Sequence, residues 1–143
     1  MTAQVAKLVT LQRRSEFLRI RNGLRWSTAA FVLEAKSRQG WAPPAPVPDQ
    51  VARFGFTVTK QLGGAVKRNR IRRRLKAAVS LTSERLARPG FDYVVIARAP
   101  AGTRVFTDLL RDFELGFDRL HSRPPKPQGE RAGPKNQRKS PLP

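Results

Sequence analysis

The chain has 143 residues, with 29 Lys and Arg against 10 Asp and Glu, which gives a formal net charge of +19. This charge predicts a polyanionic partner, and we expect nucleic acid, because no apolar run approaches the roughly 20 residues that span a bilayer. The chain has no cysteine and one histidine, His121, which excludes disulfides and thiolate metal sites and leaves no histidine set for a metal centre or catalytic triad.

The apolar residues are concentrated in one part of the chain, so we expect residues 8–121 to form a single domain after a flexible N-terminus of residues 1–7. Residues 122–143 combine six prolines and six cations with one acid, Glu130. This composition predicts a disordered basic tail that either adds non-specific electrostatic affinity or serves only solubility. With neither cysteine nor an export signal, the expected location is the cytoplasm.

In the N-terminal half, Ser15 can cap a short helix that carries Phe17 and ends near Gly23. The first strand is predicted at residues 30–35, AFVLEA. Four prolines between residues 43 and 48 exclude a helix from the next segment, so residues 36–50 are expected to form an extended loop.

Residues 53–60, RFGFTVTK, alternate apolar and small or polar side chains, which predicts a second strand. A helix to about residue 86 follows, and Pro89 and Gly90 then interrupt the chain. Residues 92–98, DYVVIAR, are typical of a strand buried on both faces. A last helix at about residues 103–121 is predicted to pack on the sheet through six apolar side chains on one side: Phe106, Leu109, Leu110, Phe113, Phe117 and Leu120.

The order helix, strand, strand, helix, strand, helix predicts a small two-layer α/β (α+β) sandwich, with helices packed on a mixed sheet. The middle helix would cross between two strands of that sheet.

This middle helix contains the most informative segment, residues 67–76, KRNRIRRRLK, in which seven of ten residues are cationic. Its apolar residues keep helical spacing through Ile71, Leu75 and Val79, so one stripe can face a core. A merely solvated basic face is the alternative, but no acid follows until Glu84. We therefore interpret the segment as a folded RNA-binding helix.

The cations of this helix repel one another. Arg68, Arg72 and Lys76 recur at four-residue spacing, and like charges at that spacing cost roughly 0.2 to 0.5 kcal/mol per pair, a cost that a bound polyanion would relieve. Gly63 and Gly64 precede the helix and would let backbone N–H groups approach a phosphate at its N-terminus.

These segments together resemble a known family. Residues 54–79, FGFTVTKQLGGAVKRNRIRRRLKAAV, followed by DYVVIAR at 92–98 and Ala-Pro-Ala at 99–101, are similar to the protein subunit of bacterial ribonuclease P. The likeness covers about residues 8–120 and centres on the triplet Arg68, Asn69 and Arg70. It implies that the basic helix forms a left-handed β-α-β crossover, as in the second domain of a small-subunit ribosomal protein.

The resemblance also implies a function. Ribonuclease P is a ribonucleoprotein endonuclease that removes the 5′ leader of precursor tRNA, with the chemistry performed by an RNA subunit and its Mg²⁺. The chain would be the non-catalytic protein subunit, with no cofactor or metal of its own. Its partners would be the catalytic RNA and precursor tRNA, with neither DNA nor a membrane.

By motif match, the residues that contact the catalytic RNA would be Arg68, Asn69, Arg70, Arg72, Arg73 and Lys76. Asn69 could instead form a local backbone hydrogen bond. The leader would lie between the first helix and one face of the sheet, against Phe17, Phe31 and Lys60, where aromatic stacking and charge neutralisation bind single strands. Core packing is the alternative role for Phe17 and Phe31.

The chain departs from the family pattern where relatives often have aromatic residues or a second lysine. Here these positions hold Ile20 or Arg21, Glu34 and Gln61, so leader binding is expected to depend more on charge. The main alternative function is a ribosomal protein or RNA-assembly factor. Two others, a DNA-binding regulator and a nuclease using Asp92, Asp108, Asp112 and Glu114, lack a supporting motif.

Overall fold

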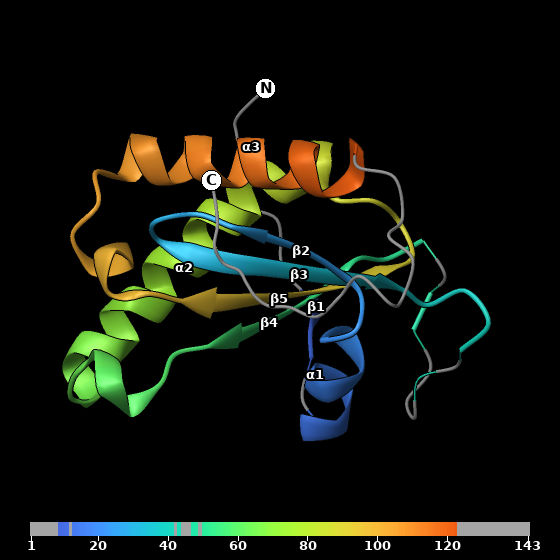
Figure 1. Ribbon diagram of the computed structural model, residues 1–143, viewed down its shortest axis with the longest axis horizontal. Coiled ribbons are helices and arrows are strands. Elements are labelled where there is room, and N and C mark those ends of the chain that lie inside the picture. The colour runs from blue at the N-terminus through green and yellow to red at the C-terminus, as the bar shows by residue number, and fades with distance from the viewer. Residues whose placement is uncertain (1–8, 12, 42, 44–46, 49, 123–143) are drawn as a thin grey trace.

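The computed structural model describes residues 9–11, 13–41, 43, 47–48 and 50–122. The predicted flexible N-terminus, and the predicted tail beyond Ser122, lie outside the described residues. The described residues form five strands and three α-helices (Figure 1). The strands are β1 Val9–Thr10, β2 Leu24–Ser27, β3 Phe31–Ser37, β4 Arg53–Thr57 and β5 Phe91–Ala97. The helices are α1 Arg14–Ile20, α2 Ala65–Leu86 and α3 Phe106–Ser122, with two 3-10 turns, η1 Lys60–Leu62 and η2 Ala99–Gly102.

The predicted fold class is confirmed, and the strands form one mixed sheet in the order β1-β4-β5-β3-β2. The neighbours β4 and β5 are parallel, and α2 connects them. In Figure 1 both strands run toward the left, β5 lies above β4 and α2 lies behind them. This arrangement makes the crossover left-handed, as the resemblance implies, and such crossovers are rare.

Several predicted boundaries differ from the structure. β1 and β2 were not predicted, because strands of two and four residues carry too little alternation to be recognised. β4 ends at Thr57, since Lys60 begins the η1 turn. Ser15 lies inside α1 rather than capping it; the backbone N–H of Arg13 instead donates to the Glu16 carboxylate at 3.2 Å. β3 continues to Ser37, and the described residues of the segment 38–50 contain no helix.

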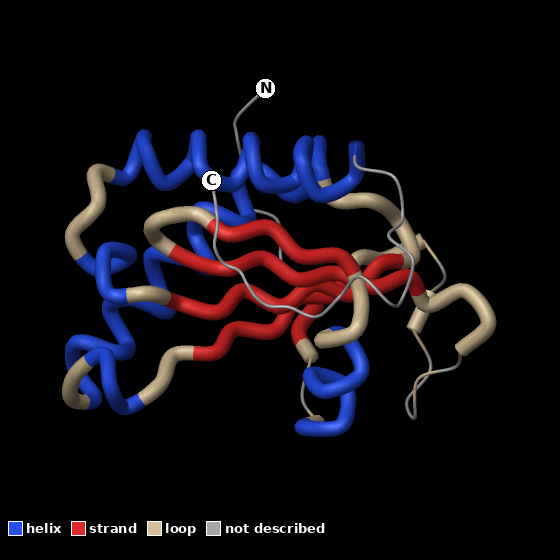
Figure 2. Tube along the Cα trace, in the orientation of Figure 1, coloured by secondary structure: helices blue, strands red, loops and turns tan. Residues whose placement is uncertain are grey.

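The main core lies between the sheet and the pair α2 and α3, which cover the same face (Figure 2). Phe31 of β3 stacks on Phe113 of α3 with ring centroids 4.1 Å apart, and Phe54 of β4 stacks on Tyr93 of β5 at 4.9 Å. The predicted apolar side of the last helix is confirmed, with Leu109, Phe113, Phe117 and Leu120 buried. In the described part of the chain, no helix is long and apolar enough to cross a membrane.

Of the helices in the described residues, the short helix α1 alone lies on the opposite face of the sheet (Figure 1). Leu11, Ile20 and Val94 form a small buried cluster there, and Phe17 packs against it. An apolar cluster of this size stabilises the contact weakly, so a second interaction must fix the position of α1.

That interaction is a buried ion cluster around Asp92, whose side chain has no exposed surface. Both of its carboxylate oxygens accept from arginines: Arg53 donates through Nε and Nη2, each at 2.8 Å, and Arg19 and Arg38 each donate at 2.6 Å. Arg53 also pairs with Glu16 of α1 at 3.0 Å. The cluster thereby joins α1, β4, β5 and the loop after β3.

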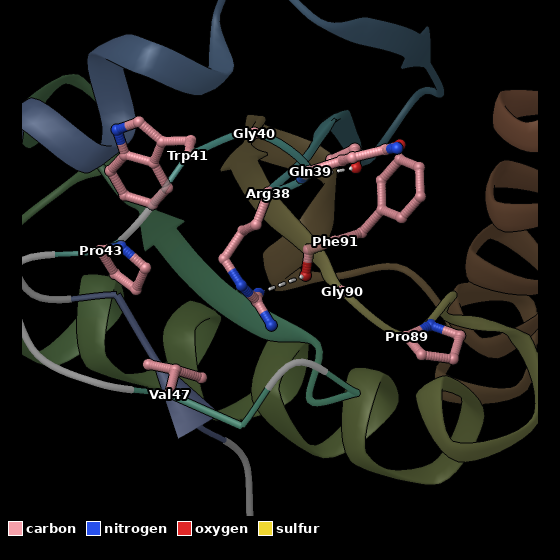
Figure 3. Close-up of a pocket in the computed structure, with 10 residues that line it drawn as sticks. Arg38, Gln39, Gly40, Trp41, Pro43, Val47, Pro89, Gly90 and Phe91 are labelled. Carbon is pink, nitrogen blue, oxygen red and sulfur yellow. Dashed lines mark hydrogen bonds between the residues drawn. The ribbon is translucent and has the colours of Figure 1, made fainter.

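Arg38 extends the cluster into the proline-rich loop. Besides Asp92, it donates to the backbone carbonyl of Phe91 at 3.3 Å (Figure 3). It also donates to the carbonyl of Pro48 at 3.3 Å and to that of Val51. The guanidinium carbon of Arg19 lies 3.9 Å from the ring centroid of Trp41, which belongs to the same loop. Guanidinium groups suit this role because their planar donors satisfy several acceptors at once.

The ionisation of Asp92 favours folding. Burial alone raises the pKa of Asp92, but hydrogen bonds from Arg53 and Arg38 outweigh it, and the net pKa lies below the ordinary 3.8. The carboxylate therefore stabilises the fold above the pKa that it has in the unfolded chain. This contribution is lost as the pH falls through the lower pKa of the folded state.

We expect Asp92→Asn to lower the free energy of unfolding by about 3 to 5 kcal/mol, because it leaves buried guanidinium groups without their shared anion. Urea denaturation at pH 7 measures the change. The control is Glu114→Gln, which breaks the exposed pair with Arg85 and should cost at most about 1 kcal/mol. Equal losses for the two variants would contradict a central role for Asp92.

Candidate RNA interface

The predicted apolar stripe of α2 is confirmed. Ile71, Leu75, Ala78 and Val79 have no exposed surface and contribute to the main core. This burial fixes the rotation of the helix about its axis. The rotation determines which cations of the basic segment face solvent.

The exposed side of the basic segment carries no neutralising acid. Five of its side chains are exposed: Lys67, Asn69, Arg70, Arg73 and Lys76. In the described ranges, none of the four cations among them forms an ion pair with a carboxylate. We call Lys67, Arg70, Arg73 and Lys76 the basic face. Its charges can therefore meet an external anion without first breaking an internal pair.

The half-buried candidates Arg68 and Arg72 make local contacts. Arg68 donates through Nε to the carbonyl of Gly63 at 3.1 Å, which ties the helix to the turn before it. Asn69 Oδ1 accepts from Arg72 Nη1 at 3.1 Å. The side chain of Asn69 thus orients a neighbouring guanidinium, rather than forming the local backbone bond considered from the sequence.

One cation of the segment points inward. Arg74 donates through Nε to the carbonyl of Ala101 at 3.0 Å and through Nη2 to the carbonyl of Arg104. Its guanidinium carbon also lies 6.0 Å from the ring centroid of Phe106. Arg74 therefore belongs to the packing between α2 and the connection from β5 to α3.

A second candidate surface lies on the α1 side of the sheet. One row across the sheet consists of register partners on four neighbouring strands: Thr57, Ile96, Val32 and Ser27. Thr57 and Ile96 are half-buried, and Ser27 is exposed. We call these four residues the partly open row.

Phe17 lies at the border of this row. It is half-buried and covers Gly55 so closely that a Cβ atom at position 55 would lie 2.5 Å from its ring. The absent side chain of Gly55 thus makes room for an aromatic ring on the sheet. The packing role considered for Phe17 is confirmed, and its contact with a leader stays a prediction.

Cations border the same surface at the end of the strands. Lys60 is exposed and begins η1, three residues after the last residue of β4. Arg98 is exposed directly after β5 and donates through Nη1 to the carbonyl of Thr28 at 3.0 Å, which places it across the end of the row. Arg98 is not among the contact residues predicted from the sequence. Its position on the α1 side could have been predicted, because Val94, Ile96 and Arg98 alternate and so share one face of the extended strand.

Phe31 requires a correction. Its ring has no exposed surface and stacks on Phe113 in the main core, on the face of the sheet opposite to α1. It has no surface to offer a nucleotide, and of its two considered roles the structure supports core packing. Glu34, where an aromatic was noted as absent, is buried on the α1 side and accepts from Arg25 at 2.6 Å.

Three of the acids considered for a nuclease are paired with arginines. The described residues contain no group of three or more His, Asp or Glu side chains placed to hold a metal ion. Asp92 is enclosed by arginines, Asp112 pairs with Arg104, and Glu114 pairs with Arg85. The nuclease alternative thus gains no support from these acids.

Comparison with known proteins shows the family of the chain. A model of the family described as ribonuclease P matches residues 5–121. The chain belongs to the ribonuclease P protein family. The ribonuclease P protein component of Brucella suis is 40% identical over 106 residues, which cover 74% of this chain and 75% of the relative. That of Ruegeria pomeroyi is 36% identical over 118 residues, which cover 82% and 88%. The resemblance found in the sequence is confirmed.

Solved structures of the family share the fold. The ribonuclease P protein of Staphylococcus aureus aligns with a TM-score of 0.64 at 23% identity, over 80% of this chain and 97% of that one. The protein from Thermotoga maritima aligns with a TM-score of 0.63 at 23% identity, over 78% and 97%.

His121 lies in the last turn of α3, in a structural rather than a catalytic setting. Its Nε2 is 2.6 Å from the hydroxyl of Tyr93, which also accepts from the backbone N–H of Arg88 at 2.7 Å. Burial, together with the charge of Arg88, lowers the pKa of His121 from 6.5 to about 4. The folded protein therefore holds a neutral imidazole at physiological pH.

We expect the protein to lose stability between pH 7 and pH 5 because of His121. In this interval the unfolded chain binds a proton at His121 that the folded chain does not bind. The contribution of the neutral imidazole to the free energy of unfolding is therefore fully present above about pH 6.5 and decreases below it. The expected loss is about 1 kcal/mol at pH 5, after allowance for solvent around the half-buried ring. Urea denaturation at both pH values measures it. His121→Gln should remove most of the decrease; an equal decrease in the variant would contradict this assignment.

Proposed function

We propose that this chain is the protein subunit of a bacterial ribonuclease P, and that it assists in the endonucleolytic removal of the 5′ leader from precursor tRNA. In this proposal the basic face of α2 binds the catalytic RNA, and the α1 side of the sheet holds the leader. The observation that supports this proposal most directly is the basic face. Its cations are exposed and form no ion pair within the described residues, and the opposite side of the helix is buried in the core.

The basic face supports RNA binding through its chemistry. Arg70 and Arg73 can each bind a phosphate bidentately or stack on an exposed base, and Lys67 and Lys76 add point charges. The half-buried Arg68 and Arg72 lie on the same helix, and Asn69 orients Arg72. The formal net charge of +19 adds a long-range attraction to RNA.

The α1 side of the sheet supports leader binding. A leader is single-stranded, and its bases can stack on an aromatic ring while cations neutralise its phosphates. Phe17 supplies the ring, the partly open row supplies a platform, and Lys60 and Arg98 supply charge. With one aromatic residue at this site, the affinity for the leader should depend more on charge than on stacking.

The protein's part in catalysis would be indirect. The cleavage chemistry is assigned to the RNA subunit and its Mg²⁺, and the chain itself is proposed to need no cofactor. By neutralising phosphates where two RNAs meet, the protein would lower the Mg²⁺ concentration that cleavage requires. Family membership favours this function over the alternative of a ribosomal protein or assembly factor.

We expect the protein to stimulate cleavage of precursor tRNA by a bacterial catalytic RNA at low Mg²⁺, and more strongly for a long leader than for a one-nucleotide leader. Single-turnover cleavage rates, with and without the protein, measure both effects. Stimulation independent of leader length would limit the protein to charge screening. Absence of stimulation would contradict the proposal and return the ribosomal or assembly-factor alternative.

We expect Phe17→Ala to weaken binding of the long-leader substrate by about 1 to 3 kcal/mol, the worth of one base stacked on an aromatic ring. Binding of the one-nucleotide-leader substrate should stay unchanged. Leu18→Ala is a matched control, because Leu18 is a neighbouring, exposed residue of the same helix. Equal losses for both substrates, or for both variants, would contradict a leader contact at Phe17.

A further inference from the structure

Arg74 differs in direction from the cations of the basic face. The cations of the basic face point to solvent, whereas the guanidinium of Arg74 donates hydrogen bonds to the carbonyls of Ala101 and Arg104. Arg74 lies three residues after Ile71 and one before Leu75, so the rotation of the helix carries it toward the core side. A phosphate contact at Arg74 would have to replace two charge-assisted hydrogen bonds.

The segment that Arg74 holds follows β5 and contains η2. Gly102 in this segment packs on Ile71 of α2 so closely that a Cβ atom at Gly102 would lie 3.3 Å from the Ile71 side chain. Arg104 is fixed from the other side, because its guanidinium pairs with Asp112 of α3. The segment is thus tied to α2 by Arg74 and to α3 by Arg104.

The position of this segment shapes the surface beside the basic face. Gly102 and Thr103 line one side of a hollow of about 770 Å³, whose other side consists of the first turn of α2 with Lys67 and Arg70. A shift of residues 101–104 away from α2 would change this hollow without moving any cation of the basic face.

We propose that Arg74 is a positioning residue, which does not bind RNA itself but holds residues 101–104 against α2 so that the surface around Lys67 and Arg70 fits the catalytic RNA. This inference rests on the proposed function. It separates Arg74 from Arg73, although the two are adjacent in sequence and equal in charge.

The test compares Arg74→Gln with the matched control Arg73→Gln, using the full chain and an in vitro transcribed bacterial catalytic RNA. The dissociation constant is measured at several salt concentrations, because each neutralised phosphate contributes roughly 0.7 to 0.9 to the slope of log affinity against log salt. Arg73→Gln should reduce the slope by about that amount. Arg74→Gln should leave the slope unchanged and weaken binding by roughly tenfold at every salt concentration, a typical coupling between contacting groups.

Arg74→Lys provides a second variant, since it keeps the charge and loses the planar fork of donors. It should weaken binding about as much as Arg74→Gln does. A reduced salt slope in Arg74→Gln, restoration of affinity by lysine, or unchanged affinity in both variants would each overturn the proposal. Failure of the wild-type protein to prefer this RNA over an unrelated structured RNA would instead overturn the proposed function.

Arginine modification of the wild-type protein gives the same test without substitutions. Phenylglyoxal should modify Arg73 readily in the free protein and poorly in the complex with RNA. Arg74 should react slowly in both, because its donors are already occupied. Rapid modification of Arg74 in the free protein, followed by protection on RNA binding, would overturn its assignment as a positioning residue.

Discussion

The convergence of Arg19, Arg38 and Arg53 on the buried carboxylate of Asp92 is the interaction on which the rest of the structure depends. The α1 side of the sheet has a small apolar cluster that cannot by itself fix a seven-residue helix. The cluster around Asp92 supplies the missing constraint, and Glu16 links it directly to α1 through Arg53. The position of Phe17 over Gly55, and hence the proposed leader surface, follows from this arrangement.

The same residue type has opposite roles in this chain. Arginines that find a buried acid or backbone carbonyls, as Arg53 and Arg74 do, hold elements together. Arginines that find no acid, as Arg70 and Arg73, form the basic face. With 29 cations and 10 acids, most cations cannot be paired internally, so the fold determines which of them face outward.

The sequence predicted the parts of the fold that have strong local patterns. The apolar stripe of α2 and the buried run of β5 extend over enough residues for their periods to be recognised. β1 and β2 are too short for that. The partners of Asp92 could not be predicted, because they come from α1, β4 and the loop after β3. Phe17 and Phe31 were both candidates for leader binding, and the fold places their rings on opposite sides of the sheet. The inward direction of Arg74 could have been predicted, because its spacing from Ile71 and Ala78 puts it beside the apolar stripe.

In the proposed complex, the sheet separates two RNA-binding surfaces, with the catalytic RNA on the α2 side and the leader on the α1 side. The chain has no cysteine, so a single introduced cysteine can carry an iron chelate that cleaves nearby RNA by hydroxyl radicals. Val66→Cys, exposed in the first turn of α2, and Ser27→Cys, exposed at the partly open row, probe the two sides. In the reconstituted complex with precursor tRNA, the α2 probe should cleave the catalytic RNA and the β2 probe should cleave the leader. Cleavage of the leader from Val66→Cys, with none from Ser27→Cys, would contradict the claim.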